Sequence, residues 1–86
     1  MKYIYVLQHV PSGDLYIGKT NNISRRLKEH NSGGNISTKR INGLWKLVYA
    51  EVYRSEKDAD IRELRLKKHG RAKQELYKRI SFSLLS

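Results

Sequence analysis

The sequence predicts a small α+β fold, in which a three-stranded antiparallel sheet is flanked by about three helices in the order ββαβαα. Alternating aromatic and β-branched residues mark the strands, and apolar residues at helical spacing mark the helices. A Pro-Ser-Gly-Asp turn joins the first two strands. A chain of 86 residues has room for one compact core, so residues 1–86 are interpreted as a single domain.

The first two strands are predicted over residues 3–9 and 15–19. The turn between them suits a hairpin, because Pro11 presets its own φ and Gly13 tolerates a positive φ. Pairing of the two strands is expected to place Tyr5 and Tyr16 near opposite each other, with a register uncertain by about one residue.

The first helix is predicted over residues 23–31, before a glycine-rich stretch ends it. Asn22 precedes the helical pattern and is a plausible N-cap. Ile23 and Leu27 form the inner stripe, and Arg26 and His30 lie four residues apart on the edge of that stripe.

Residues 45–53 form the third predicted strand. Simple alternation places Leu47, Tyr49 and Tyr53 on one face and other apolar residues on the opposite face. Because both faces are apolar, we expect this segment to be the central strand of the sheet, covered on both sides.

Two further helices are predicted after this strand. Residues 55–58 resemble a capping box with Asp58 in place of the usual glutamate, and the helix that follows runs to about residue 69. Gly70 is expected to be its C-terminal stop. The last helix spans residues 71–80 and aligns Ala72, Leu76 and Ile80, whereas residues 81–86 are too short to assign.

Charge is the main compositional signal, with 18 Lys and Arg against 8 Asp and Glu and a net charge of +10. This excess lies mostly in residues 19–40 and 62–79 and favours a polyanionic partner; the alternative is a solvated surface that charge keeps soluble. The chain has no cysteine, which excludes disulfides and thiolate zinc sites and fits a cytoplasmic location. No apolar run approaches about 18 residues, and no signal-peptide core is present, so no membrane association is expected.

Glu63 stands out because it falls on the inner stripe of its predicted helix, between Ala59 and Leu66. A carboxylate in such a place is costly unless it is paired or bound to a cation. One interpretation is an ion pair with Arg62 or Lys67. The other is a metal ligand, since Mg²⁺ is commonly held by one carboxylate together with waters and substrate phosphate oxygens.

The hairpin and the first helix supply the other candidate groups. Arg26 offers bidentate bonding to a phosphate, and His30 titrates near neutrality and could shuttle a proton. The phenols of Tyr5 and Tyr16 are poor bases at a pKa of about 10, and we expect nearby cations and a metal-bound water to lower that pKa. Gly18 has no side chain, so a phosphate or a helix can approach the end of its strand.

These residues resemble the GIY-YIG endonuclease superfamily over nearly the whole chain. The resemblance rests on Tyr16-Ile17-Gly18, on the run from residue 19 to Arg26 and His30, on residues 45–49, and on the helix that contains Glu63. The chain looks most like small stand-alone bacterial members, and it is similar to the N-terminal incision domain of the bacterial excision-repair nuclease and to homing endonuclease catalytic domains. It departs from the pattern at Tyr3, where the family has its first glycine, and it lacks a clear counterpart of a late asparagine.

The resemblance implies a one-metal hydrolysis of a phosphodiester bond. Glu63 would hold Mg²⁺ or Mn²⁺, Tyr5 would be the general base, and Tyr16 would position water or phosphate. Arg26 would stabilise the developing charge, and His30 would relay the proton. Basic residues expected to bind the nucleic-acid backbone are Lys19, Lys39, Arg40, Lys67, Lys68, Arg71 and Lys73.

The expected partner is DNA, including branched or nicked DNA, bound with weak sequence specificity by a monomer or weak dimer, with DNA repair among the expected roles. No small-molecule cofactor is expected. Two alternatives remain open. One is a non-catalytic basic nucleic-acid-binding module that retains the GIY-YIG fold, and the other is an interaction domain that docks an acidic protein.

Overall fold

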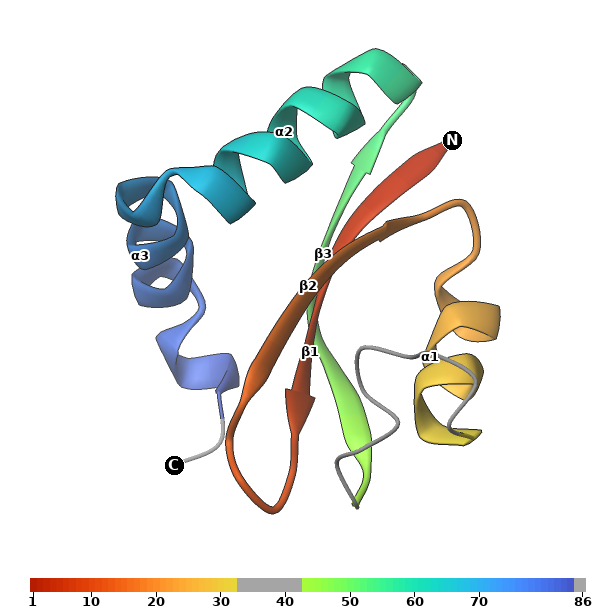
Figure 1. The fold of residues 1–86 in the computed structure, drawn as a ribbon, viewed down its shortest axis with the longest axis vertical. Coiled ribbons are helices and arrows are strands. Elements are labelled where there is room, and N and C mark those ends of the chain that lie inside the picture. The colour runs from red at the N-terminus through yellow and green to blue at the C-terminus, as the bar shows by residue number, and fades with distance from the viewer. Residues whose placement is uncertain (33–42, 85–86) are drawn as a thin grey trace.

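The computed structural model describes residues 1–32 and 43–84, and its elements follow the predicted order. They are β1 (Lys2–His9), β2 (Leu15–Thr20), α1 (Ile23–Ser32), β3 (Trp45–Tyr53), α2 (Glu56–Lys68), α3 (Gly70–Arg79) and a short 3₁₀ turn over Ser81–Ser83. The strands form an antiparallel sheet, with α1 on one side of it and α2 and α3 on the other (Figure 1). The predicted α+β class is confirmed.

The central strand is β1, because the sheet order is β2-β1-β3. Six consecutive residues of β1, from Ile4 to His9, are buried. In β3, by contrast, Leu47 is 41% exposed and Val52 is 56% exposed. The expectation that residues 45–53 form the central strand is therefore wrong. Although β3 has apolar residues on both faces, it is a partly exposed edge strand. Only β1 has a neighbouring strand on each side, and it is therefore the strand that is fully enclosed.

A β-bulge explains why simple alternation fails in β3. Val6 pairs with Tyr49 and Leu7 pairs with Leu47, which leaves Val48 as an extra residue between the two pairs. Val48 and Tyr49 consequently both pack against the core below α2 and α3, and Leu47 falls on the opposite face, opposite Leu7. The prediction that Leu47 and Tyr49 share a face is wrong for this reason.

Successive side chains of β1 point to opposite faces of the sheet and pack into two separate cores. Even-numbered residues Ile4 and Val6 enter the larger core beneath α2 and α3, and odd-numbered residues Tyr5 and Leu7 enter a smaller core beneath α1. The larger core also contains Ile17, Ala59, Leu66, Leu76 and Ile80, and the smaller one also contains Trp45 with Tyr16 and Leu27 packed against it. The smaller core is mostly aromatic, and the Tyr5 hydroxyl that centres the candidate active site belongs to it.

The start of α1 is fixed as the sequence predicts. The backbone N–H of Arg25 donates to Asn22 Oδ1 at 3.0 Å, which is the N-cap interaction. The N–H of Asn22 in turn donates to Thr20 Oγ1 at 3.1 Å. These bonds tie the first turn of α1 to the end of β2, so the helix leaves the hairpin in a defined direction.

The junctions of α2 differ from expectation. Its N-cap Ser55 makes no side-chain capping bond, so the predicted capping box is not formed. The helix ends at Lys68, and His69 turns the chain in an extended conformation (φ −111°, ψ 100°). Gly70 is the first residue of α3 rather than a stop, and among the described residues a positive φ occurs only at Gly13 and Gly43. Because His69 itself breaks the helix, no left-handed glycine is needed there.

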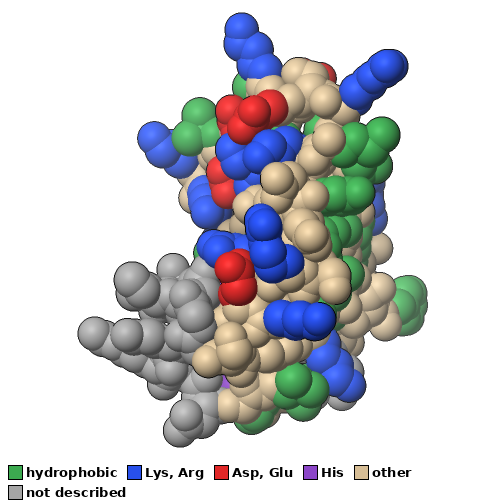
Figure 2. Space-filling model, turned by 90° about the vertical axis from the view of Figure 1, so that its right-hand side faces the viewer, with side chains coloured by type: hydrophobic (Ala, Val, Ile, Leu, Met, Phe, Trp, Pro, Cys, Tyr) green, Lys and Arg blue, Asp and Glu red, His purple; other side chains and the backbone are tan. Residues whose placement is uncertain are grey.

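The surface reflects the basic composition. Figure 2 shows Lys and Arg side chains spread along the length of one face of the molecule, with acidic side chains interspersed between some of them. Within residues 1–32 and 43–84, no helix has both the length and the apolar character that crossing a membrane requires.

Candidate active site

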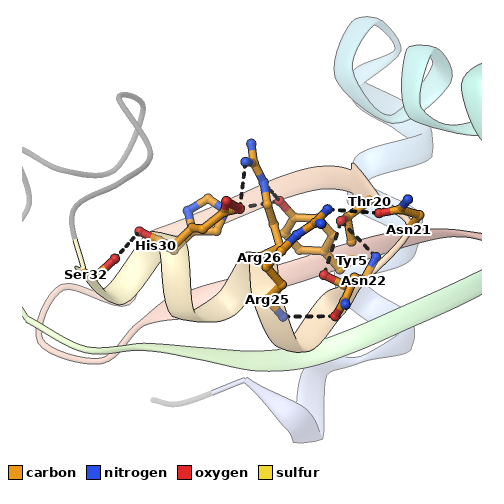
Figure 3. A network of polar contacts seen from close by, with 9 residues as sticks. Tyr5, Thr20, Asn21, Asn22, Arg25, Arg26, His30 and Ser32 are labelled. Carbon is orange, nitrogen blue, oxygen red and sulfur yellow. Dashed lines mark hydrogen bonds and ion pairs between the residues drawn. The ribbon is translucent and has the colours of Figure 1, made fainter.

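The hydroxyl of Tyr5 is the centre of a polar cluster between β1 and α1. Tyr5 is 1% exposed, and its Oη lies 3.0 Å from His30 Nε2 (Figure 3). The Nε of Arg26 donates to the same oxygen at 3.4 Å. Arg26 and His30 are one helical turn apart on α1, so a single helix face presents both groups to the phenol. The structure therefore brings together three of the residues singled out in the sequence.

The environment sets the protonation of this cluster. Burial raises the pKa of Tyr5 above 10.0. The hydrogen bond from Arg26 lowers this pKa, as expected of a nearby cation, but the effect of burial is larger. Burial also lowers the pKa of His30 below 6.5, and the charge of Arg26 adds to that effect. At neutral pH the phenol thus keeps its proton and the imidazole is neutral. The Tyr5 hydroxyl can then donate to His30 Nε2 while it accepts from Arg26.

Tyr16 and Gly18 complete this face of the hairpin. Tyr5 pairs with Gly18, and Tyr16 pairs with Leu7, so the two tyrosines are diagonal neighbours with ring centroids 6.3 Å apart. The Tyr16 ring also meets the His30 ring edge-on, at 4.7 Å between centroids. A Cβ at Gly18 would lie 2.3 Å from Tyr5 Oη. The missing side chain of Gly18 therefore accommodates the Tyr5 ring, and the approach of a phosphate to this strand end stays a prediction.

Glu63 lies on α2, on the other side of the sheet from α1. Its side chain is 24% exposed, and Lys67 Nζ is 3.3 Å from Glu63 Oε2. The Glu63 charge contributes to the raised pKa of Tyr5, after the effects of burial and of Tyr16, and it also contributes at Lys19. The carboxylate is therefore within electrostatic range of the Tyr5 hydroxyl across the β2 edge. The predicted ion pair with Lys67 is present.

The donor set around Glu63 fits a hard divalent cation but not a multi-ligand protein cage. The described residues contain no group of three or more His, Cys, Asp or Glu side chains that could hold a metal ion. The Glu63 carboxylate is partly buried and already attracts one cation, Lys67. A single carboxylate suits Mg²⁺ or Mn²⁺ when waters and substrate phosphate oxygens supply the remaining ligands.

Two polar residues of α1 position this cluster, and the sequence analysis missed both. Glu29 Oε1 accepts a hydrogen bond from Arg26 Nη1 at 3.2 Å, which orients the guanidinium. Asn31 bonds to both backbone groups of Trp45, at 2.8 Å to the N–H and 3.1 Å to the carbonyl. The spacing of Arg26 and Glu29 on a predicted helix could have revealed the first interaction. The hydrogen bonds of Asn31 join α1 to β3, and no local sequence pattern predicts such a contact.

A second polar cluster, also missed, lies on the opposite face of the sheet. Arg62 donates to both carboxylate oxygens of Glu51, at 2.9 Å each, and Tyr49 and Tyr53 donate at 2.7 and 2.6 Å. Burial opposes ionisation, but the hydrogen bonds from Arg62 and the tyrosines hold the pKa of Glu51 at about 2. Burial and the bond to Glu51 raise the pKa of Tyr53 to about 12. Every donor in this cluster is aimed at one carboxylate.

Besides Lys67, which pairs with Glu63, two of the predicted backbone-binding cations are already paired. Lys19 forms an ion pair with Asp60 of α2. Arg71 forms an exposed pair with Glu75, 3.4 Å apart and four residues along α3. Exposed pairs of this kind contribute little to stability, so both cations could exchange a carboxylate for a phosphate.

The remaining predicted cations differ in their surroundings. Lys67 and Lys73 line a hollow beside β2 that Tyr16 also lines. Lys68 is exposed at the end of α2. Lys39 and Arg40 lie outside the described residues.

The fold and the Tyr5 cluster define a GIY-YIG catalytic domain: residues 1–78 match that family, and the chain belongs to it. The resemblance drawn from the sequence is thereby confirmed. The family is one of nucleases, which implies a nucleic acid substrate and, in general, a divalent metal.

Relatives of similar size extend this assignment. The chain is 40% identical over 68 residues to a UPF0213 protein of Clostridium perfringens, covering 79% of this chain and 72% of that protein. It is 41% identical over 75 residues to a UPF0213 protein of Bacillus licheniformis, covering 87% and 76%. The solution NMR structure of a UPF0213 protein from Bacillus halodurans superposes with a TM-score of 0.56 at 31% identity, covering 93% of this chain and 85% of that one.

Proposed function

We propose that this protein is a divalent-metal-dependent DNA endonuclease that hydrolyses phosphodiester bonds. The observation that supports this proposal is the Tyr5 hydroxyl, which is hydrogen-bonded both to a neutral histidine and to an arginine in a domain of a nuclease family. This arrangement gives the phenol a proton acceptor on one side and a fixed positive charge on the other.

Proton transfer runs through Tyr5 to His30. The attacking water gives its proton to Tyr5 Oη as the Tyr5 proton passes to His30 Nε2, 3.0 Å away. A relay is required because burial raises the pKa of Tyr5, so little free phenolate exists at neutral pH. The lowered pKa of His30 keeps the imidazole neutral and able to accept the proton.

Arg26 and Tyr16 act on the phosphate. The guanidinium of Arg26, which Glu29 orients from behind, stabilises the negative charge that builds up on the phosphorus oxygens. Tyr16 positions the water or the phosphate, and its hydroxyl makes no hydrogen bond with a described residue that would compete. One catalytic centre of this size cuts one strand in each encounter.

Glu63 would hold Mg²⁺ or Mn²⁺, which when bound polarises the scissile phosphate and stabilises the leaving oxygen. The expected products carry 5′-phosphate and 3′-hydroxyl ends. We further propose that residues 1–86 act as one domain, as a monomer or weak dimer in the cytoplasm. The substrates would include branched or nicked DNA, consistent with a repair role. The net charge of +10 supports binding that depends on salt and reads little sequence.

The test is cleavage of supercoiled plasmid and of a labelled branched DNA at low salt, with Mg²⁺, with Mn²⁺ and with EDTA. Wild-type protein is expected to nick both substrates only with metal, and Tyr5→Phe and Glu63→Ala are expected to lose the activity. Tyr53→Phe, which removes a phenol on the opposite face, should cut normally. Cleavage that persists in Glu63→Ala would contradict the assigned metal ligand.

A non-catalytic nucleic-acid-binding module is the second candidate. The observation in its favour is that Lys67 already neutralises Glu63, at 3.3 Å, where a metal would have to bind. Strong DNA binding with no nicking under any metal would select this candidate.

A further inference from the structure

A hollow of about 280 Å³ lies beside the catalytic cluster, at the free edge of β2. Its walls come from β2, α2 and α3, and the lining residues are Leu15, Tyr16, Ile17, Lys67, Lys73 and Tyr77. Because β2 is an edge strand with β1 on one side only, nothing in the described sheet covers its outer edge. The hollow is therefore open to a ligand that runs along the strand.

The lining combines flat apolar surface with positive charge. Tyr77 and Leu15 pack against the larger core from its margin, and burial raises the pKa of Tyr77, so its ring stays neutral. Lys73 makes no ion pair with any described residue, and none of the acidic side chains in residues 1–32 and 43–84 lines the hollow. An aromatic face next to lysines is the combination that binds the base and the phosphate of a single nucleotide.

The hollow and the proposed catalytic site have two neighbouring residues in common. Tyr16 lines it, and the Tyr16 ring is 4.7 Å from the His30 ring and 6.3 Å from the Tyr5 ring, centroid to centroid. Lys67 also lines it, and the Lys67 amine is 3.3 Å from the Glu63 carboxylate. A strand whose phosphate lies between Tyr5 and Glu63 would thus place an adjacent nucleotide at the hollow.

We propose that this hollow binds one unpaired nucleotide of the strand that is cut, next to the scissile phosphate. The inference rests on the proposed nuclease function and specifies its substrate class: nucleic acid with an unpaired nucleotide at the cut, as at a frayed end, a gap or a flap. The hollow's volume of about 280 Å³ is close to the roughly 300 Å³ at which ligand pockets usually begin, and this size suits one nucleotide better than a base pair. Continuous duplex would first have to unpair, which costs free energy, whereas a nucleotide that is already unpaired enters without that cost.

The first experiment measures binding without metal, so that it does not depend on cleavage. Fluorescence anisotropy would compare a labelled duplex that has a short single-stranded overhang with a blunt duplex of the same length. Lys73→Gln is expected to weaken binding of the overhang DNA about tenfold more than binding of the blunt DNA. Lys78→Gln, which removes the same charge from α3 outside the hollow, should weaken both DNAs equally.

Tyr77 separates stacking from charge. Tyr77→Phe keeps the ring and should retain the overhang preference, whereas Tyr77→Leu should lose about tenfold in overhang binding. Because Tyr77 also packs against the larger core, the circular dichroism spectrum of Tyr77→Leu must match that of the wild-type protein. If the spectrum differs, the test of the nucleotide site is the Lys73→Gln variant. A parallel titration with an RNA overhang in place of the DNA overhang shows whether the unpaired nucleotide that binds is a deoxyribonucleotide or a ribonucleotide.

The outcomes for the hollow and for the nuclease are separable. Equal weakening of overhang and blunt DNA by Lys73→Gln and Lys78→Gln would overturn the nucleotide site, even if wild-type protein cuts DNA with Mg²⁺. An overhang preference that depends on Lys73 and Tyr77, in a protein that cuts no substrate, would support the site and reject the nuclease function. Cleavage placed at the junction between paired and unpaired nucleotides, and shifted or slowed by Lys73→Gln, would support both.

Discussion

Each face of the sheet has a cluster in which a tyrosine hydroxyl and an arginine share hydrogen bonds, and the two clusters differ in which group accepts the phenol proton. On the α1 face, the Tyr5 hydroxyl lies between Arg26 and the imidazole of His30. On the α2 face, Tyr49 and Tyr53 donate to Glu51, whose oxygens also accept both bonds from Arg62.

The acceptor decides whether the phenol can exchange its proton. The carboxylate of Glu51 has a pKa of about 2 and the phenol of Tyr53 has a pKa of about 12, so no proton moves between them near neutrality. A neutral imidazole with a pKa below 6.5 is a far better proton acceptor than such a carboxylate. Similar donor groups therefore make a closed structural cluster on one face and a candidate proton relay on the other.

Removing one phenol from each cluster gives the largest contrast. Tyr5→Phe is expected to lower the cleavage rate by about 10² to 10⁴-fold, the usual contribution of a general acid or base, with little change in fold. Tyr53→Phe removes one bond to Glu51 and should leave the rate unchanged while it lowers unfolding free energy by about 1 kcal/mol. Plasmid-nicking rates and urea unfolding measure the two effects. Equal losses of rate in both variants would contradict a catalytic role that belongs to Tyr5 and not to Tyr53.

A methyl group at Gly18 tests the geometry of the Tyr5 cluster. The added Cβ would lie 2.3 Å from Tyr5 Oη, so Gly18→Ala must displace the phenol from Arg26 and His30. Displacements of about 1 Å at a reacting group can cost about 100-fold in rate, which is the expected loss. Gly70→Ala is the control, because nothing lies within 4 Å of its added Cβ. Normal cleavage by Gly18→Ala would remove Tyr5 from the mechanism.

Disrupting the Glu51 cluster should affect stability rather than chemistry. Glu51→Gln is expected to cost about 2 kcal/mol, below the range for a fully buried pair because the Glu51 and Arg62 side chains remain 14% and 27% exposed. Glu75→Gln, which breaks an exposed pair with Arg71, should cost less than about 0.5 kcal/mol. Urea unfolding at neutral pH gives both values, and cleavage below the unfolding temperature should be normal in each variant.

The Glu51 carboxylate should also make the stability of the fold depend on pH. The pKa of Glu51 is about 2 in the folded protein and 4.5 in its ordinary state, so its ionisation stabilises the fold above pH 4.5. This contribution is lost as pH falls from 4.5 toward 2, because the unfolded state then binds the proton first. Glu51→Gln should flatten that part of the stability curve, and a curve with unchanged slope would assign acid unfolding to other groups.

The smallest effect concerns the pH–rate profile. If neutral His30 accepts the proton, the cleavage rate should fall only below pH 6.5, where the lowered pKa of His30 lies. The raised pKa of Tyr5 places its ionisation above pH 10, so the rate should stay flat from about pH 7 to 9. A tenfold rise per pH unit across that interval would indicate direct use of a phenolate or hydroxide instead of the relay.

Much of the site could be predicted from local spacing and family resemblance. Arg26 and His30 meet one phenol because they are four residues apart on a helix that Asn22 caps, and both facts are readable in the sequence. The Glu51 cluster could be predicted only in part. Tyr49, Glu51 and Tyr53 alternate along β3 and share a face, but Arg62 comes from α2, and its approach depends on how that helix packs on the sheet. The upward shift of the Tyr5 pKa could not be predicted either, because it depends on how completely the ring is buried.

The sequence by itself determined the order of the elements, their approximate ends and the residue types on each helix face, because these follow from interactions within a few residues. Only the tertiary structure decided that β1 is the central strand, that Val48 forms a bulge, and that Gly18 lies under the Tyr5 ring. It alone placed the hollow beside β2, which Tyr16 and Lys73 both line. Strand order, register and pKa depend on which distant segments exclude water from one another, and that choice is made by the packing of the whole chain.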